Sequence, residues 1–221
     1  MNNINTSKQQ IQVNYEEKKV KIYSLIKRIA DIILSLIAII LLSPIFLIVA
    51  LVVRFDSKGK IVFGHERIGK DMNKFKIYKF RTMYENSEEI FNNFTEAQKK
   101  EYYINFKLDK DPRITKVGRF LRETSLDELP QLINILKGDM SIVGPRPIVE
   151  KEIEKYGLYA KVVFSVLPGL TGYWQANGRS DTTYDERVKM DMYYIRNRST
   201  LMDIKIILKT VISVIKKEGA I

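Results

Sequence analysis

The chain has 221 residues, enough for one domain, and carries a formal net charge of +11. It has no cysteine and a single histidine, His65, which excludes disulfides, thiolate catalysis, cysteine–zinc sites and sites built from several histidines. Acid–base or nucleophilic chemistry must therefore come mainly from carboxylates, with lysine and arginine binding anions, and a metal would be a hard cation such as Mg²⁺ held by oxygen. The positive charge favours a polyanionic partner, which is nucleic acid, anionic lipid or a phosphorylated substrate.

An uncharged apolar run occupies residues 32–53 and is interrupted by Ser43 and Pro44. Its length is that of a membrane segment, because a helix needs ~20 apolar residues to cross ~30 Å of hydrocarbon. The polar residues 1–18 before it predict a loose tail. A signal peptide is not indicated, since the run is long and no small-residue cleavage site follows it.

Basic residues lie on both sides of the apolar run, and positive charge beside a membrane segment prefers the cytoplasm. A helix that enters, breaks and leaves on one face keeps both flanks there. Pro44 removes a backbone donor at the centre of the run, and Ser43 can bond the backbone group left unpaired. A spanning helix with a proline kink explains the run about equally well, and the flanks favour the re-entrant alternative. The flanking residues are Lys18, Lys19, Lys21, Lys27 and Arg28 before the run, and Arg54, Lys58 and Lys60 after it.

The middle of the chain alternates short β-prone and helical patterns. Residues 61–66 and 74–80 are β-prone and separated by a turn sequence, which predicts a hairpin. The polar stretch 85–107 is compatible with helix. The later expectations are, in order, a turn at 111–113, a short basic helix over 114–122, a segment over 125–136 ending at Gly138, a rigid loop over 143–147, a helix over 148–164, and turns at 167–170 and 177–179 around Trp174.

The C-terminal segment has an apolar stripe of helical period with lysines off it. A basic amphipathic helix is typical of an anionic membrane surface, and a helix packed on the core fits the pattern equally well. The stripe comprises Ile204, Ile207, Leu208, Val211, Val214 and Ile215, and the lysines are Lys205, Lys209, Lys216 and Lys217.

Asp127 and Glu128 are the candidate catalytic pair. Adjacent carboxylates at a helix start can approach one phosphate or metal ion. The alternative is structural: Ser125 with Glu128 three residues later forms a capping box, and acids in a first turn complement the helix dipole. Taken alone, the capping box is the better explanation, although Pro130 argues against a regular helix from Leu126.

Basic residues around the acid pair favour a phosphate ligand. The planar fork of arginine binds phosphate oxygens in pairs. Arg146 stands between Pro145 and Pro147, which fix the backbone, and a stiff turn with an exposed arginine is its structural alternative. Lys79 and Arg81 share one face of a predicted strand, and an edge strand protected by charge is their structural alternative. The other basic candidates are Lys107, Lys110, Arg113, Lys116, Arg119 and Arg122, for which the alternative is a solvated or lipid-facing basic face. His65 is expected to be structural or at the surface, and Trp174 to lie in the core or anchor an interface.

On the residues described above, the sequence resembles the bacterial sugar transferases, the monotopic phosphoglycosyl transferases of polyprenol-linked glycan synthesis. The resemblance covers roughly residues 22–218, nearly the whole chain. Its motifs are residues 27–31, the Ser43-Pro44 break, and residues 78–83, 111–115, 124–132, 137–147, 168–172 and 174–175. The part beyond Gly178 is similar to the hexose-type members.

The resemblance implies a mostly helical α+β monotopic membrane protein. Residues 1–21 would be the polar tail, 22–54 the re-entrant membrane helix and 55–221 the cytosolic catalytic domain, with amphipathic helices at the interface. It moves the expectation firmly to the re-entrant form. The enzyme would act at the cytoplasmic face of the bacterial inner membrane.

The implied reaction moves a sugar-1-phosphate from a UDP-sugar to undecaprenyl phosphate and releases UMP. Asp127 would be the nucleophile of a covalent aspartyl-phosphosugar intermediate, and Glu128 would hold Mg²⁺. Arg122, Arg146 and Pro145 match the phosphate- and nucleotide-binding positions, and Lys79 and Arg81 match a basic motif near the site. Magnesium and arginines would offset the repulsion between a carboxylate and a diphosphate.

Two other classes remain as alternatives. A non-catalytic scaffold could bind anionic lipid through its basic face, with salt-sensitive binding and no need of the acid pair. A membrane-tethered nucleic-acid binder rests on charge alone and has no motif. The sequence leaves open which sugar is moved, which polyprenol accepts it, which glycan is made, and whether the protein is a monomer or a homodimer.

Overall fold

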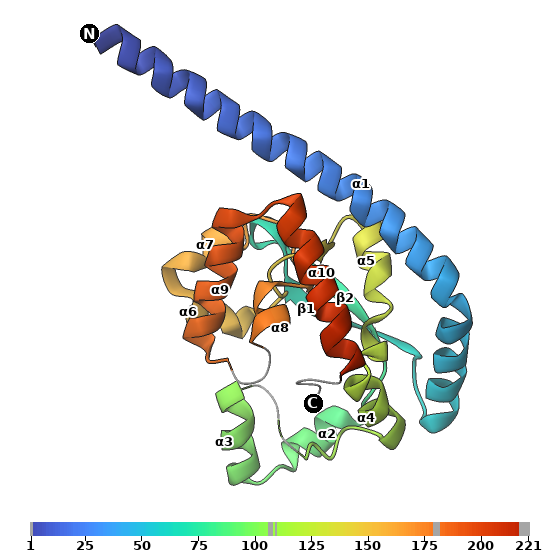
Figure 1. Cartoon of the computed structure of the whole chain (residues 1–221). Helices are drawn as coiled ribbons and strands as arrows, with labels where there is room; N and C mark the ends of the chain where they lie inside the picture. Colours follow the sequence, from blue (N-terminus) through green and yellow to red (C-terminus); the bar gives the residue numbers. More distant parts are fainter. Residues whose placement is uncertain (1, 106–107, 109, 179–181, 217–221) are drawn as a thin grey trace.

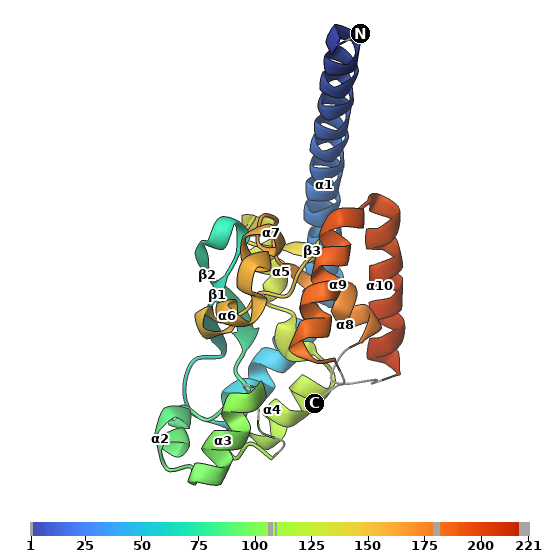
Figure 2. The same ribbon diagram turned by 90° about the vertical axis from the view of Figure 1, so that its left-hand side faces the viewer.

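The computed structural model of the chain describes residues 2–105, 108, 110–178 and 182–216. A long N-terminal helix lies along a lobe of short helices and two small sheets (Figure 1). The fold is therefore mostly helical α+β, as the sequence predicts. The first turns of the long N-terminal helix project beyond the lobe, as Figure 2 also shows.

Helix α1 runs from Asn2 to Asp56 without interruption by a loop and bends along its length (Figure 1). The prediction of a loose tail is wrong at the level of the backbone, because the helix already begins at Asn2. Pro44 lies inside it and cannot donate to the Ile40 carbonyl, and the Ser43 hydroxyl donates to that oxygen instead, at 2.8 Å. Among the described residues, the part from Val20 to Asp56 is the one helix long and apolar enough to cross a membrane.

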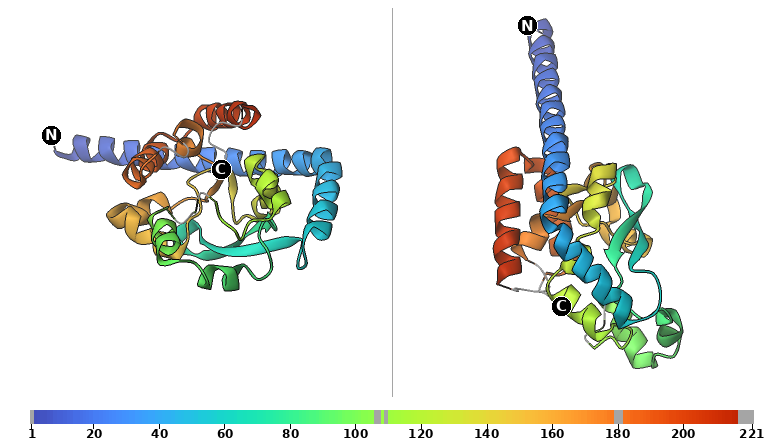
Figure 3. Two further views of the ribbon diagram at one scale, coloured as in Figure 1. Left: turned by 90° about the horizontal axis from the view of Figure 1, so that it is seen from below. Right: turned by 90° about the vertical axis from the view of Figure 1, so that its right-hand side faces the viewer.

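One face of α1 packs on the lobe over much of its length, and the rest exposes leucine and isoleucine side chains. Near the start, Lys27 contacts Asp203 at 2.8 Å and Arg28 donates to the carbonyls of Ile135 and Leu136. Near the end, Val49 and Val53 lie in a buried cluster. Figure 3 (right) shows α1 running down the lobe between α10 and the β-hairpin.

The predicted hairpin is confirmed. Strand β1, Val62–Ile68, pairs antiparallel with β2, Lys74–Phe80, so that Lys79 is opposite Phe63. A short 3-10 turn, η1 Lys70–Met72, joins them. The polar stretch that follows contains α2, Ser87–Asn92, and α3, Glu96–Asn105, and the predicted basic helix is α4, Lys116–Glu123.

The segment after α4 holds the candidate site. A 3-10 turn, η2 Leu126–Glu128, precedes α5, Gln131–Lys137, which ends at Gly138 with a positive φ of 92°. Strand β3, Ser141–Val143, then pairs in parallel with β4, Gly169–Thr171. Residues 167–170 were predicted as a turn, and that prediction is wrong because Gly169 to Leu170 belong to this strand.

The predicted helix over 148–164 is also wrong as one element. It consists of η3 Glu150–Glu152, α6 Ile153–Tyr156, η4 Gly157–Tyr159 and α7 Ala160–Val163. Gly157 separates α6 from the later pieces with φ 50° and ψ −130°, a conformation outside the right-handed helix. The pieces pack on α9 around Tyr156, Val163 and Phe164.

The last helices are α8, Tyr173–Asn177, α9, Tyr184–Asn197, and α10, Thr200–Ile215. Helix α8 takes in the start of the predicted turn at 177–179, whose Arg179 lies outside the described residues. In α10, Asp203, Ile206 and Ser213 are buried, whereas most of the predicted apolar stripe is exposed, including Leu208. Lys217 also lies outside the described residues. The stripe is thus not the face that packs on the core, and Figure 2 shows α10 at the edge of the lobe.

Candidate active site

Asp127 and Glu128 lie in η2 rather than in a capped helix. Ser125 before them adopts a left-handed conformation with φ 56° and makes no side-chain cap bond. The helix after them begins at Gln131, with Pro130 at its N-cap position. The capping-box interpretation is therefore wrong for this segment. A non-glycine residue at positive φ stores strain that is typical of functional turns.

Lys79 of strand β2 holds both carboxylates. Its Nζ lies 2.6 Å from Oε1 of Glu128 and 3.5 Å from Oδ2 of Asp127. Asp127 is buried, whereas the Glu128 side chain keeps 23% of its surface exposed. The ammonium group therefore offsets part of the negative charge of the pair from the sheet side and leaves Glu128 reachable.

The two carboxyl groups have opposite pKa shifts. Burial raises the pKa of Asp127, and Lys79 only partly opposes this. Burial also disfavours the charged form of Glu128, but the positive charges of Lys79 and Arg146 outweigh it and hold its pKa below the usual range. A pair with separated pKa values is typical of sites where two acids have different roles.

Arg122 reaches the pair from the end of α4. Its Nε donates to the Thr82 hydroxyl at 2.9 Å, and burial lowers its pKa, while the charge of Asp127 opposes that shift. Helix α4 approaches the segment just after β2 this closely because Gly118 has no side chain: a Cβ there would lie 2.0 Å from the Thr82 carbonyl oxygen. The glycine thus fixes the position of Arg122.

Arg146 projects from the predicted rigid loop. Pro145 and Pro147 on either side are buried and Arg146 is exposed. The loop is tied down by β4, because the Gly169 N–H donates to the Pro145 carbonyl at 2.8 Å. The side chain lines a small pocket whose other residues are Arg67, Ile77, Lys79, Glu128, Gln131, Pro147, Gly169 and Leu170.

This arrangement can bind a phosphate group next to a buried carboxylate. A family model described as bacterial sugar transferase matches residues 22–217. The chain belongs to the bacterial sugar transferase family. The prediction of a phosphoglycosyl transferase is confirmed at this level, and the long apolar helix and the family indicate membrane association.

Curated relatives agree with the family. The exopolysaccharide production protein ExoY of Sinorhizobium fredii is 46% identical over 197 residues, which are 88% of this chain and 87% of that protein. The undecaprenyl-phosphate galactose phosphotransferase of Salmonella typhimurium is 44% identical, over 88% of this chain and 41% of the relative. The UDP-glucose:undecaprenyl-phosphate glucose-1-phosphate transferase of Escherichia coli is 40% identical, over 85% and 39%. This chain therefore spans less than half the length of the last two sugar transferases.

Arg81 is engaged elsewhere in this sugar transferase. Its guanidinium donates to the carbonyls of Val53, Ser57 and Lys60, at 2.8, 2.5 and 2.7 Å, and so holds the end of α1 and the loop after it. A role of Arg81 in substrate binding stays a prediction, and the geometry accounts for the residue as a clamp on the end of the long apolar helix α1.

The other basic candidates are not gathered at the acid pair. Arg113 is buried, pairs with Asp111 at 2.6 Å and stacks on the rings of Phe91, Phe94 and Tyr102. Lys110, Lys116 and Arg119 are exposed, and Lys107 lies outside the described residues. His65 is exposed on β1, and Trp174 is buried in α8, as expected.

Sequence reasoning missed the side chains that align the sugar transferase site. Asn134 of α5 is fully buried, accepts from the Tyr78 N–H at 2.9 Å and donates to the Lys76 carbonyl at 2.8 Å. Gln131 and Arg67 line the pocket. A polar residue at an apolar position of a short helix was the available signal for Asn134.

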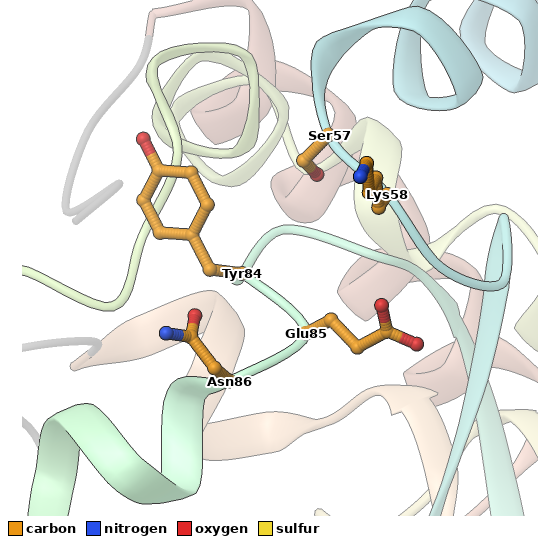
Figure 4. A pocket seen from close by; sticks show the side chains of 5 residues that line it. All are labelled: Ser57, Lys58, Tyr84, Glu85 and Asn86. Carbon is orange, nitrogen blue, oxygen red and sulfur yellow. The ribbon is translucent and has the colours of Figure 1, made fainter.

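A larger open cavity of about 380 Å³ lies outside the acid pair. Its lining, drawn in Figure 4, consists of Ser57, Lys58, Tyr84, Glu85 and Asn86, between the end of α1 and the strand β2 exit. It contains neither carboxylate of the pair. The candidate active site of this sugar transferase is therefore the smaller, charged pocket.

Proposed function

We propose that the protein transfers a sugar-1-phosphate from a UDP-sugar to undecaprenyl phosphate and releases UMP. The observation that carries this is a buried Asp127 beside Glu128, both in contact with Lys79 at a pocket that Arg146 also lines. Two relatives are named for the transfer of a sugar phosphate to undecaprenyl phosphate, and one of these names gives UDP-glucose as the donor.

The proposed chemistry is a double displacement. A carboxylate oxygen of Asp127 attacks the phosphorus that carries the sugar, and the bond from that phosphorus to the bridging oxygen of the diphosphate breaks, so UMP leaves with the electron pair. A phosphate oxygen of the lipid then attacks the same phosphorus, and the Asp127–phosphorus bond breaks. The sugar-1-phosphate has then moved and the carboxylate is restored.

Positive charge makes an attack by a carboxylate on a diphosphate feasible. Lys79 already contacts both acids, Arg122 lies near Asp127, and Arg146 acts on Glu128. Cations fixed around the reacting phosphorus offset the negative charge that accumulates in the transition state. Thr82 holds Arg122, and the Pro-Arg-Pro loop holds the backbone of Arg146. Little reorganisation of these two side chains is therefore needed.

Mg²⁺ fits Glu128 as its protein ligand in this proposal. Its carboxylate is partly exposed and offers the hard oxygen that Mg²⁺ prefers. The described residues contain no cluster of three or more His, Cys, Asp or Glu suited to a metal, so phosphate oxygens and water would complete the coordination. When bound, Mg²⁺ would neutralise part of the diphosphate charge.

We also propose that α1 is re-entrant and that the enzyme lies at the cytoplasmic face of the inner membrane. Both ends of the apolar segment contact the same lobe, through Lys27 and Asp203 at one end and through Arg81 and Val53 at the other. A straight span would separate these contacts by the ~30 Å thickness of the hydrocarbon. The hydrogen bond from Ser43 to Ile40 supports a bend within lipid, because it satisfies the carbonyl that Pro44 leaves without a donor.

The reaction is tested by UMP release from a panel of UDP-sugars, with Mg²⁺ and with or without undecaprenyl phosphate. Asp127→Asn is expected to lower release by at least ~10³-fold, the scale of losing a nucleophile, while the protein stays folded and membrane-bound. Asp185→Asn, an exposed aspartate of α9, is the matched control. Near wild-type release by Asp127→Asn would refute Asp127 as the nucleophile, and silence of the folded wild type on every donor would favour the lipid-binding scaffold.

Topology has a separate test. Tags at residue 1 and at residue 221 are expected on the same side of the membrane, both accessible from the cytoplasm. Protease protection of one tag only, in sealed vesicles, would establish a spanning helix.

A further inference from the structure

The pocket beside the acid pair contains an arginine that the mechanism above does not use. Arg67 lies on strand β1, one residue before Ile68, and its side chain lines the pocket with Arg146. Within the described part of the chain, neither guanidinium group forms a hydrogen bond or an ion pair with another side chain. Burial, then the nearby charge of Arg146, lowers the pKa of Arg67 to about 10.

Glu152, the carboxylate whose negative charge acts most strongly on Arg67, already has hydrogen-bond partners. Glu152 accepts a hydrogen bond from the Val149 N–H at 2.8 Å and another from the Tyr184 hydroxyl. Its attraction for Arg67 is outweighed by burial and by Arg146. Arg67 and Arg146 are like charges in one pocket, and the Glu128 carboxylate in its wall is already paired with Lys79, so an anion bound between the two arginines would be favourable.

The backbone holds these two arginines together. The Ile68 N–H donates to the Ile148 carbonyl at 2.8 Å, so the strand that carries Arg67 is tied to the chain two residues beyond Arg146. Gln131, which is 2% exposed, also lines the pocket. Its Nε2 lies close to Glu128 but makes no well-formed hydrogen bond with a described residue. The pocket therefore offers donors to a missing acceptor.

The hairpin register separates Arg67 from the attacking carboxylate. Lys79 is opposite Phe63 and Arg67 is opposite Phe75, so the two cations start from positions four residues apart on one face, roughly 13 Å along the strands. Lys79 is already shared between Asp127 and Glu128, whereas Arg67 is available to a ligand. Arg67 thus starts at the end of the pocket away from Lys79, and Arg146 is close enough to act on both Arg67 and Glu128.

We propose that Arg67, together with Arg146, binds the phosphate group that leaves with the nucleotide. The inference rests on the proposed function, since it assigns the phosphate of UMP to the two arginines and the transferred phosphoryl group to Asp127. A guanidinium fork suits two oxygens of one phosphate, which a lysine at the same position would not reproduce. Arg67 is then a substrate-binding residue beside those predicted from the sequence.

The test is a titration of the full-length detergent-solubilised protein with UMP and, in parallel, with uridine. Arg67→Gln is expected to weaken UMP binding by ~10- to 100-fold, the worth of a charge-assisted hydrogen-bond pair, and to leave uridine binding unchanged. Arg67→Lys should fall between the two. Lys76→Gln is the control, because Lys76 is exposed on the opposite face of the same hairpin.

Unchanged UMP affinity in Arg67→Gln, or a wild type that does not bind UMP, would overturn the proposal. Equal losses for UMP and uridine would also overturn it, since they indicate damage to the whole pocket. If Arg67→Gln does not fold, Arg67→Lys decides, and wild-type UMP affinity in that variant counts against the fork. A wild type that binds UMP through Arg67 but transfers no sugar would instead contradict the proposed function and leave this site intact.

Discussion

Asn134 is the residue that sets the distance between the acid pair and its lysine. Its amide bonds the backbone of β2 on either side of Ile77, and its own helix starts just after Glu128. Because Lys79 follows Tyr78 directly, the two hydrogen bonds fix the height of Lys79 against η2. A fully buried amide with both ends satisfied specifies one arrangement, whereas an apolar side chain would allow the strand to slide.

We predict that Asn134→Ala destabilises the protein by about 3 kcal/mol, because it leaves a buried N–H and a buried carbonyl unpaired. Transfer activity should fall further than the folded fraction does, since Lys79 loses its alignment. Thermal unfolding in detergent and UMP release measure the two effects. Asn92→Ala, on the exposed end of α2, should change neither. A variant as stable as the wild type would contradict this role.

At the scale of elements, helix α9 carries a buried aspartate, Asp191, on the face that packs on α6. Asp191 is 0% exposed, accepts a hydrogen bond from Tyr156 of α6 at 3.1 Å, and has Arg187 nearby on its own helix. Burial, only partly opposed by Tyr156 and Arg187, raises the pKa of Asp191 to about 7. The folded protein therefore binds a proton here between pH ~4 and ~7 that the unfolded chain has released.

This bound proton determines how the free energy of unfolding changes with pH. Folding stability should fall as the pH rises from ~4 to ~7, by on the order of 4 kcal/mol for this group, and stay level above that. Asp191→Asn should flatten this part of the stability curve and unfold at a higher temperature than the wild type at pH 8. Unfolding scans at pH 5, 6.5 and 8 give the answer, with exposed Asp185→Asn as reference. Parallel curves for wild type and Asp191→Asn would exclude Asp191 as the cause.

Elements were predictable where one local signal decided them. The hairpin followed from β-prone runs and a turn, and the helical stripe of α10 from its period, which left open whether the stripe packs on the core or is exposed. The region 148–164 failed because apolar spacing does not reveal that Gly157 adopts a positive φ. Residues 167–170 failed because β4 exists through long-range bonds to β3, which no local pattern contains.

The acid pair shows the same division. Asp127, Glu128 and Arg146 were proposed as site residues from composition and motif, and their neighbours in sequence were enough to suggest phosphate. Lys79 was known only as a weaker candidate, since its contact with Glu128 joins residues 49 positions apart. Arg67 was missed because its value lies in having no side-chain partner, which only the packed pocket reveals.

At the scale of the whole molecule, three charged residues join the long apolar helix α1 to the lobe. Lys27 pairs with Asp203 of α10, Arg28 donates to carbonyls at the end of α5, and Asp31 accepts the Ile142 N–H of β3 at 3.0 Å. Each binds a different element. The part of the chain before the apolar run is thus a clamp on the catalytic lobe, which explains charges that the sequence assigned only to orientation.

We predict that Arg28→Ala loosens this clamp. Two carbonyls at the C-terminus of α5 lose a charged donor, a loss of about 2 kcal/mol, and α5 should become more susceptible to proteolysis in the membrane-bound protein. Transfer should decrease because α5 follows the acid pair. Lys21→Ala, with an exposed side chain on the same helix, is the control. Equal protease sensitivity of the two variants would mean that α5 does not depend on Arg28.

The pairing of Lys27 with Asp203 joins positions 176 residues apart, and this governs the order of assembly during synthesis. The apolar segment leaves the ribosome early, while its partner on α10 is made almost last. With the proposed membrane location, the segment must stay in the bilayer for most of translation without the lobe that later holds it, and long-range contacts of this kind form slowly. Chains cut short before residue 203 should therefore reach the membrane and still lack a settled catalytic lobe.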